Sequence, residues 1–252
     1  MGKDILKGRM LFDWHTHTTY SHGKGTIEDN VRTARKLGLT SLAITDHGPG
    51  HFGYGFKRKD IPAMRRDIDE LNARYDDITI YMSVEANIIN PSGLLDVKPE
   101  EFEYYDFVIA GYHFGTLGDH PAASMLLHGQ NLAARARKHY SDKLIEKNTE
   151  MVVASLLKNP IRTLTHPGDK GEVDLDLVFM TCEKTGTLLE ISNRHKQLTV
   201  EEIRRAMKYD VQFILGSDAH LPDKVGGCEL ALERVKEAGL DPERIVNFAP
   251  GE

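Results

Sequence analysis

The sequence contains only two cysteines, Cys182 and Cys228, among its 252 residues. Two thiols are too few for a disulfide framework and suggest a reducing compartment, so we expect a cytoplasmic protein. No stretch approaches the about 18 consecutive apolar residues that a membrane span requires. The first ten residues are charged and lack the apolar segment of a secretory signal. We therefore expect neither a membrane span nor export.

Linkers, repeats and blocks of like charge are also absent from the sequence. Without a linker we expect a single domain over residues 1–252, because one large barrel fits that length as well as two small domains do. The net charge of −6 argues against a dedicated nucleic-acid-binding protein, which usually carries a basic stripe. The residue in excess is histidine, with 12 copies, and this excess is a first indication of metal binding.

Strand-like apolar runs alternate with helix-like amphipathic runs along the chain. Strands are predicted at residues 10–14, 41–45, 79–84, 107–111, 161–165, 187–191 and 211–215. Helices are predicted at residues 26–37, 60–74, 141–157, 175–185, 199–209 and 229–238. Short apolar strands that alternate with helices are typical of a buried parallel sheet, either open or closed into a barrel. Residues 115–140 are predicted to be a decorated loop with some helical content near its end.

Each predicted strand ends in a polar side chain, and most of these side chains can bind a metal. In a barrel of alternating strands and helices, all these carboxyl ends lie on one face, where active sites form. This shared position is stronger evidence for a site than any single motif. The residues in question are His15, His17, Asp46, His47, Glu85, His113, His166, Asn193, Asp218 and His220.

Two spaced pairs among these residues point to a metal ion. Residues i and i+2 of a strand face the same way. His15 and His17 can therefore reach one ion, and Asp218 and His220 can do the same. Either pair alone occurs by chance, but the two pairs together favour a metal site.

The other strand-end residues allow more than one interpretation. Asp46 is expected either to orient a histidine or to cap a helix. Glu85 would be costly to bury unpaired, and bridging two cations would remove that cost. A Pro-Gly turn after His166 exposes its ring. Of the remaining histidines, His128 and His139 are expected to be ordinary surface residues.

Together these residues fall into motifs that resemble the polymerase and histidinol phosphatase (PHP) family of metal-dependent phosphoesterases. The motifs follow the family's order from position 13 to position 220. They are Asp13-Trp-His-Thr-His17, Ser21-His22, Thr45-Asp-His47, Val84-Glu85-Ala-Asn87, Gly111-Tyr-His113, Thr165-His-Pro167 and Ser217-Asp-Ala-His220. The sequence looks closest to the short stand-alone members and to the PHP domains of bacterial family X DNA polymerases.

The resemblance implies a distorted seven-stranded (βα) barrel, similar to a TIM barrel, that holds three divalent metal ions. Carried over by position, the first ion takes His15, His17, Glu85 and Asp218, the second shares Glu85 and takes His113 and His166, and the third takes His22, His47 and His220. All nine ligand positions are filled, which favours an active enzyme. Nitrogen and oxygen ligands without a thiolate suit zinc, manganese or iron.

The chemistry that such a site implies is hydrolysis of a phosphoester. Close cations lower the pKa of a bridging water, so that hydroxide can attack phosphorus in line while the non-bridging oxygens are neutralised. Glu85 and Asp218 would hold the ions for this step. Arginine can hold phosphate by two parallel hydrogen bonds. Arg194 is the favoured phosphate contact because it follows the sixth predicted strand, beside the predicted site face, and Lys57 and Arg58 are further candidates.

The proton for the leaving group has two candidate sources, His195 and the metal-bound waters. The preferred function is a phosphatase that acts on a small phosphomonoester, of which histidinol phosphate is one candidate. A nuclease or a protein-phosphotyrosine phosphatase of the same family is an alternative. A metal-dependent amidohydrolase is less favoured, because His113 stands where those barrels often carry a modified lysine. An inactive, metal-loaded interaction domain is the remaining alternative.

Overall fold

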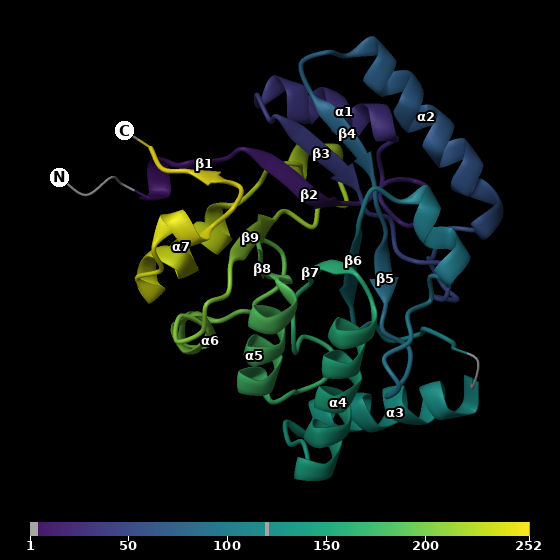
Figure 1. Ribbon diagram of the computed structural model, residues 1–252, viewed down its shortest axis with the longest axis vertical. Helices are drawn as coiled ribbons and strands as arrows, with labels where there is room; N and C mark the ends of the chain where they lie inside the picture. The colour runs from purple at the N-terminus through teal and green to yellow at the C-terminus, as the bar shows by residue number, and fades with distance from the viewer. Residues whose placement is uncertain (1–4, 119–120, 252) are drawn as a thin grey trace.

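A computed structural model describes residues 5–118 and 121–251 and contains the alternating strands and helices that the sequence predicts (Figure 1). Its strands are β1 (Arg9–Met10), β2 (Phe12–Thr16), β3 (Ser41–Ile44), β4 (Thr79–Met82), β5 (Glu85–Asn87), β6 (Val108–Gly111), β7 (Ile161–Leu164), β8 (Leu188–Ser192), β9 (Phe213–Gly216) and β10 (Phe248–Ala249). Its α-helices are α1 (Ile27–Lys36), α2 (Ile61–Arg74), α3 (Pro121–Arg137), α4 (Asp142–Lys158), α5 (Leu175–Thr185), α6 (Val200–Ala206) and α7 (Glu229–Ala238). Short 3-10 helices are η1 (Ile5–Lys7), η2 (Arg58–Asp60), η3 (Pro99–Tyr104), η4 (Pro222–Lys224) and η5 (Pro242–Arg244).

The strands pair in two parallel sheets and one antiparallel ribbon. The first parallel sheet has the order β2-β3-β4, and the second runs from β5 to β9 in chain order. The ribbon joins β1 to β10. The predicted third strand, residues 79–84, ends at Met82 as β4 and pairs with β3. A further strand that was not predicted, β5, begins at Glu85 and pairs with β6. A mixed α/β fold with parallel sheets is therefore confirmed.

Isolated bridges connect the two parallel sheets on both sides. Thr16, the last residue of β2, bridges to Ala219 beyond β9. His47, which follows β3, bridges to Glu85 at the start of β5. Both bridges are parallel, so the carboxyl ends of both sheets face a common region.

Helices on the outside of the sheets complete the core. In Figure 1, α1 and α2 lie beside β3 and β4, while α3, α4 and α5 lie on the side of β5 to β8. All residues of β3, β6 and β9 are buried, which is expected of parallel strands that are covered on both faces. Among the residues that the structure describes, no helix is both long and apolar enough to cross a membrane.

Helix α6 begins with the capping box that its sequence predicts. The hydroxyl of Thr199 accepts a hydrogen bond from the backbone N–H of Glu202, whose carboxylate accepts one from the N–H of Thr199. We expect Thr199→Ala to lower the free energy of unfolding by about 1 kcal/mol, because the backbone N–H of Glu202 loses its partner. Urea denaturation measures this change. Thr33→Ala, inside α1, is the control, and an equal loss there would contradict a specific role of the cap.

Residues 115–140 do not form the long loop that the sequence predicts. Pro121–Arg137 is a helix of 17 residues, α3, and residues 119–120 lie outside the described part of the chain. Apolar side chains on the outer side of this helix, those of Met125, Leu126 and Leu132, are exposed. They obscure the periodicity by which an amphipathic helix is recognised.

His128 on α3 is buried, so its predicted place on the surface is wrong. Its Nδ1 lies 2.8 Å from the Tyr112 hydroxyl, and its Nε2 lies 2.8 Å from the carbonyl oxygen of Thr116. The side chain of Asn131 donates to the same hydroxyl. These bonds satisfy the polar atoms of His128 inside the protein and attach α3 to the end of β6. His139 is exposed, as predicted.

Candidate active site

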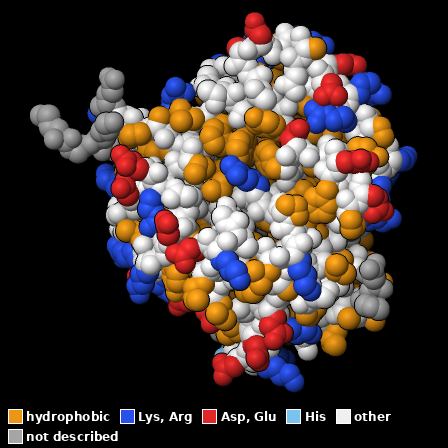
Figure 2. Space-filling model, viewed as in Figure 1, with side chains coloured by type: hydrophobic (Ala, Val, Ile, Leu, Met, Phe, Trp, Pro, Cys, Tyr) orange, Lys and Arg blue, Asp and Glu red, His pale blue; other side chains and the backbone are white. Residues whose placement is uncertain are grey.

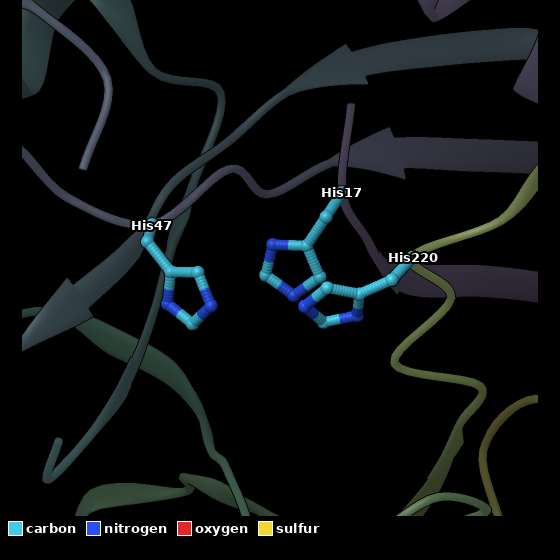
Figure 3. Close-up of side chains that lie close together, drawn as sticks. All are labelled: His17, His47 and His220. Atoms are coloured by element: carbon cyan, nitrogen blue, oxygen red, sulfur yellow. The ribbon is translucent and has the colours of Figure 1, made fainter. Parts of the chain in front are cut away.

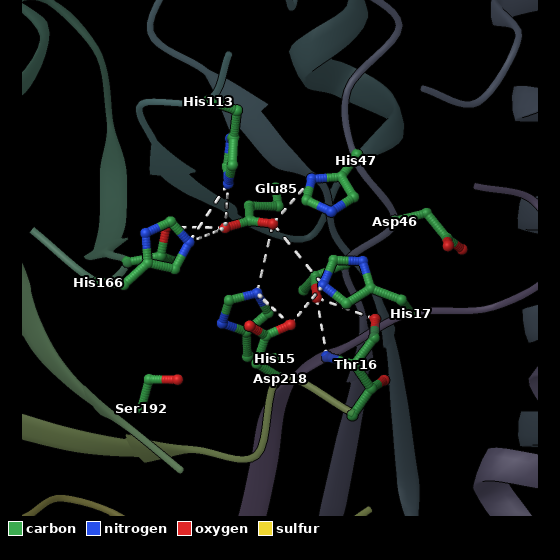
Figure 4. A network of polar contacts seen from close by, with 12 residues as sticks. His15, Thr16, His17, Asp46, His47, Glu85, His113, His166, Ser192 and Asp218 are labelled. Atoms are coloured by element: carbon green, nitrogen blue, oxygen red, sulfur yellow. Dashed lines mark hydrogen bonds and ion pairs between the residues drawn. The ribbon is translucent and has the colours of Figure 1, made fainter. Parts of the chain in front are cut away.

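The buried carboxylate of Glu85 stands at the centre of a group of histidines (Figure 4). Its Oε2 lies 3.0 Å from Nδ1 of His47 and 3.4 Å from Nε2 of His15. Its Oε1 lies 3.0 Å from Nε2 of His166 and 3.4 Å from Nε2 of His113. One carboxylate at the start of β5 is thus in contact with imidazoles from the ends of β2, β3, β6 and β7.

A second carboxylate, that of Asp218 after β9, lies close to the same group. Its Oδ1 is 3.2 Å from Nε2 of His17 and 3.8 Å from Nε2 of His15. Asp218 and His166 have φ angles of 50° and 30°, in a region that residues with a Cβ rarely adopt. Such backbone strain is typical of functional sites, where the surrounding structure holds it in place.

Three imidazoles converge in Figure 3, those of His17, His47 and His220. A ring nitrogen of each lies within 4.8 Å of those of the other two. His22 lies beside them, with its ring centroid 4.2 Å from that of His220 and 4.9 Å from that of His47. The residues predicted for the third ion are therefore neighbours, and His17 lies among them.

Two further groups have the same spacing of potential ligand atoms. They are His15 with His17 and Asp218, and His47 with Glu85 and His113. His166 lies next to the second group, because its Nε2 is 3.3 Å from Nε2 of His113. The structure thus brings together all nine residues predicted as metal ligands, although the groups cut across the predicted division among three ions.

Glu190 is a site residue that the sequence prediction missed. It lies within β8 and is buried. Its Oε1 lies 2.5 Å from Nδ1 of His15, and its Oε2 accepts a hydrogen bond from the backbone N–H of His166 at 3.0 Å. A carboxylate bonded to one ring nitrogen directs the other nitrogen of His15 toward the cluster. The signal in the sequence is an acidic residue within an apolar strand.

Asp46 and Asn193, both strand-end residues, support the backbone around the cluster. Asp46 accepts hydrogen bonds from the N–H and hydroxyl of Thr18 and from the hydroxyl of Ser21. It therefore fixes the loop after β2, and the two roles that the sequence suggested for it were both wrong. The side-chain oxygen of Asn193 accepts a hydrogen bond from the N–H of Leu230, so it caps the start of α7.

Several buried polar atoms of the cluster lack a hydrogen bond to any described residue. They are Nε2 of His15, both ring nitrogens of His17, Nδ1 of His22, Nδ1 of His47 and Oε2 of Glu85. Buried polar atoms without partners cost free energy. Nitrogen and oxygen lone pairs that converge on one region are also what divalent cations bind. The residues present therefore fit a metal centre.

The charges of the cluster support the same conclusion. Burial lowers the pKa of His17 to about 3 and lowers that of His47 well below its usual value. Both rings are therefore neutral, which is the form that binds metals. Burial raises the pKa of Glu85, but the neighbouring His113 and His15 outweigh it and hold that pKa well below its usual value. Cations would balance the buried carboxylates of Glu85, Glu190 and Asp218.

Arg194 and His195 follow β8 at the edge of the cluster. Nη1 of Arg194 lies 3.4 Å from Oδ1 of Asp218 and contacts the ring of His220. His195 lies between two carboxylates, with Nε2 3.1 Å from Asp218 and Nδ1 3.2 Å from Asp169. Burial lowers the pKa of His195, but these two carboxylates outweigh it and raise the pKa to about 9.

The other two predicted substrate contacts, Lys57 and Arg58, lie at the start of η2. Arg58 donates to Oε1 of Glu101 and to the carbonyl oxygen of Asp96, both at 2.6 Å. Its guanidinium is thus already engaged by the chain, whereas Lys57 is exposed. Neither residue is among the described residues that line the cleft beside the cluster.

This cleft has a volume of about 630 Å³. Asp218, His220 and Arg194 line it where it meets the cluster. Apolar and charged side chains line the rest, including those of Leu37, Leu221, Lys224, Glu229 and Leu230. A concave site of this size suits a small molecule.

Parallel strands whose carboxyl ends carry clustered histidines and carboxylates define a protein with a candidate metal centre at one end of its sheets. The PHP domain model matches residues 13–209, which is more than half of the chain. The chain therefore belongs to the PHP domain family, as the motifs of its sequence imply. Asp218 and His220 lie beyond the matched range and join the site through the fold.

Similar proteins include two bacterial sequences. A "Probable phosphatase" of Thermoanaerobacter is 29% identical over 262 residues, which cover 96% of this chain and 92% of the relative. "Probable phosphatase YcdX" of Escherichia coli is 28% identical over 253 residues, which cover 94% of this chain and 90% of the relative.

A solved structure with a similar fold is the histidinol phosphate phosphatase of Lactococcus lactis, in complex with zinc, L-histidinol and phosphate. The TM-score is 0.60 at 17% identity, and the match covers 92% of this chain and 95% of the other. At this identity the likeness concerns the fold alone.

Proposed function

We propose that this protein is a phosphatase that hydrolyses a small phosphomonoester at a site for three divalent metal ions. The observation that carries the proposal is the convergence of nine potential ligands beside a cleft of about 630 Å³. The relatives named as phosphatases support the reaction class. The fold around the site is proposed to be one domain, a distorted seven-stranded (βα) barrel. The bridges Thr16–Ala219 and His47–Glu85, which connect the two parallel sheets, support it.

The ligands proposed for the ions are those expected from the sequence. They are His15, His17, His22, His47, Glu85, His113, His166, Asp218 and His220. When bound, close divalent cations would lower the pKa of water and neutralise charge on a phosphate. Zinc is one candidate, since it is present in the Lactococcus lactis structure, and manganese or iron suits the same ligand atoms.

The chain's own residues would orient and protonate the substrate. Arg194 lies between the cluster and the cleft, where its guanidinium can donate parallel hydrogen bonds to phosphate oxygens. His195 is proposed to donate the proton to the leaving group, because it lies within 3.1 Å of Asp218 and can carry that proton near neutral pH. The side chain of Asp169 holds the ring of His195 from the other side.

Replacing Arg194 by alanine is expected to lower kcat/KM by roughly 10- to 100-fold, mainly through KM, since a charge-assisted hydrogen bond contributes about 1.5–3 kcal/mol. Steady-state kinetics on an active phosphomonoester measure this change. Arg204→Ala is the matched control, because the Arg204 side chain on α6 is 49% exposed and that of Arg194 is 48% exposed. Equal kinetics for the two variants would contradict a phosphate contact at Arg194.

The size of the cleft favours a small substrate over a macromolecule. Basic and acidic side chains are interspersed over the face of the protein shown in Figure 2, whereas a nuclease usually presents a basic stripe. Screening purified, metal-analysed protein against phosphorylated metabolites, a single-stranded DNA and a phosphotyrosyl peptide tests the proposal. We expect turnover of a small monoester to exceed that of both macromolecular substrates. Turnover of amide substrates alone would favour an amidohydrolase instead.

A further inference from the structure

Asp96 is a buried carboxylate outside the cluster. Hydrogen bonds connect it to the cluster through one intervening residue, Asn87. It is in the segment between β5 and η3 and is 6% exposed. Its Oδ1 accepts a hydrogen bond from the backbone N–H of Asn87 at 2.8 Å, and its Oδ2 accepts one from the Asn87 side-chain amide at 2.6 Å. The N–H of Gly50 also donates to Oδ2, at 2.8 Å. A buried carboxylate is costly unless such donors surround it, and here all three donors are N–H groups.

This arrangement fixes which way the amide of Asn87 points. On one side of the amide lie Oδ2 of Asp96 and the carbonyl oxygen of Gly48, the latter at 3.5 Å. Both of these oxygens can only accept, so the NH2 group of Asn87 must face them. The side-chain oxygen of Asn87 then necessarily faces the other way.

That oxygen meets the ring of His113. Nδ1 of His113 lies 2.8 Å from Oδ1 of Asn87. Because Oδ1 can only accept, Nδ1 must be the nitrogen that carries the proton whenever the imidazole has only one. Nε2 is then left with a free lone pair, and it is Nε2 that lies 3.4 Å from Oε1 of Glu85 in the cluster. The carboxylate of Asp96 therefore fixes the orientation of the Asn87 amide, and that amide fixes the tautomer of His113.

The same carboxylate also holds the loop that follows β3. Gly48 and Gly50 lie against Asp96, and a Cβ added at Gly48 would come within 2.5 Å of both carboxylate oxygens. Glycine is therefore required for this close approach. The loop continues to Tyr54, whose ring centroid is 4.3 Å from that of His22 and 4.8 Å from that of His47.

We propose that Asp96 is a positioning residue that, through Asn87, holds His113 in the tautomer that presents Nε2 to a metal ion. The proposal rests on the proposed metal site, and it adds the reason why one of its ligands is ready to bind. Neither Asp96 nor Asn87 is expected to contact the ion or the substrate. Their effect is exerted through the direction of two hydrogen bonds.

The first test needs no variant and no substrate. In metal-free protein labelled with ¹⁵N-histidine, long-range ¹H–¹⁵N correlation spectra distinguish a protonated ring nitrogen from a bare one. We expect His113 to have a protonated Nδ1 and a bare Nε2, with its signals assigned by their loss in His113→Gln. A singly protonated His113 ring with its proton on Nε2 would overturn the proposal, whatever reaction the enzyme catalyses.

Asp96→Asn tests the link between the two residues. In this variant an NH2 group replaces one of the carboxylate oxygens and faces N–H donors that the oxygen accepted from. The amide of Asn87 can relieve its part of this conflict by turning over, but its NH2 group then faces Nδ1 of His113. We expect a mixed or reversed tautomer of His113. We also expect the affinity for Zn²⁺, measured by competition with a chelator, to fall by roughly 10- to 100-fold at one ion per chain.

The exchanged pair Asn87→Asp with Asp96→Asn separates positioning from a general loss of structure. A carboxylate at position 87 can accept from Nδ1 of His113 and from the amide at position 96, so the acceptor that faces His113 is restored, although the NH2 group at position 96 still faces a backbone N–H. We expect this double variant to recover the His113 tautomer and part of the lost Zn²⁺ affinity. Asp46→Asn, which removes a different buried carboxylate, should leave the tautomer unchanged. An unchanged tautomer in Asp96→Asn, or no recovery in the double variant, would overturn the proposal.

Discussion

Replacing Glu85 by glutamine is expected to lower kcat/KM by at least about 1000-fold, because a bound cation contributes several kcal/mol of charge stabilisation to the transition state. Glu85 contacts histidines from four strand ends, at 3.0–3.4 Å. Its amide replacement keeps the size of the side chain but removes the negative charge that two cations would share. Metal analysis should show fewer ions per chain, and circular dichroism should show an unchanged fold.

The matched control for this substitution is Glu101→Gln. Glu101 is also a buried glutamate, but it pairs with Arg58 outside the cluster. We expect this variant to lose some stability and to keep its bound metal and most of its turnover. If Glu85→Gln turned over substrate as fast as Glu101→Gln does, the proposed role of Glu85 would be wrong.

Removing metal with a chelator is expected to abolish turnover, and adding Zn²⁺ or Mn²⁺ back is expected to restore it. The apparent stability should change as well, since a ligand at 1000 times its dissociation constant stabilises the native state by about 4 kcal/mol. We therefore expect a lower Tm in metal-free protein and recovery of both Tm and activity in the same titration.

The ring nitrogens of His17 that lack hydrogen bonds to described residues give this expectation its structural basis, because a bound cation would satisfy them. The carboxylate of Asp218 contacts His15 and His17. We therefore expect Asp218→Ala to bind less metal and to recover little activity when metal is added back. Full activity in chelator-treated wild-type protein, with its metal content verified as zero, would exclude metal-dependent hydrolysis.

The positions of the site residues were predictable because two simple rules apply to parallel strands. Carboxyl ends of neighbouring strands meet on one side of a sheet, and residues i and i+2 face the same way. These rules place His15, His17 and Asp218 together although about 200 positions separate the first from the last. Neither rule requires knowledge of which strands pair. The predicted positions of the site residues are therefore correct although the break between β4 and β5 was not predicted.

The partners of those residues could not be predicted in the same way. Glu190 lies inside a strand, and its contact with His15 depends on the pairing and tilt of β8. The link from Asp96 to His113 depends on a loop conformation that glycines at positions 48 and 50 permit. Hydrogen bonds between segments that are distant in sequence leave no periodic signal in either segment.

Errors in the sequence prediction have physical causes of the same kind. The sequence predicts a surface position for His128, yet a hydroxyl and a carbonyl group satisfy its ring inside the protein. The contact of Arg58, a candidate phosphate ligand, with Glu101, a partner 43 positions away, likewise leaves no signal in the sequence.

The central claim is that the clustered histidines and carboxylates hold divalent cations. The most direct test is a crystal structure of metal-loaded protein with anomalous scattering data collected at the absorption edge of the bound element. We predict three ions in the cluster around Glu85, with Asp218 and His113 among their ligands. Ions bound only at other places on the protein, or none at a saturating concentration of Zn²⁺ or Mn²⁺, would contradict the account.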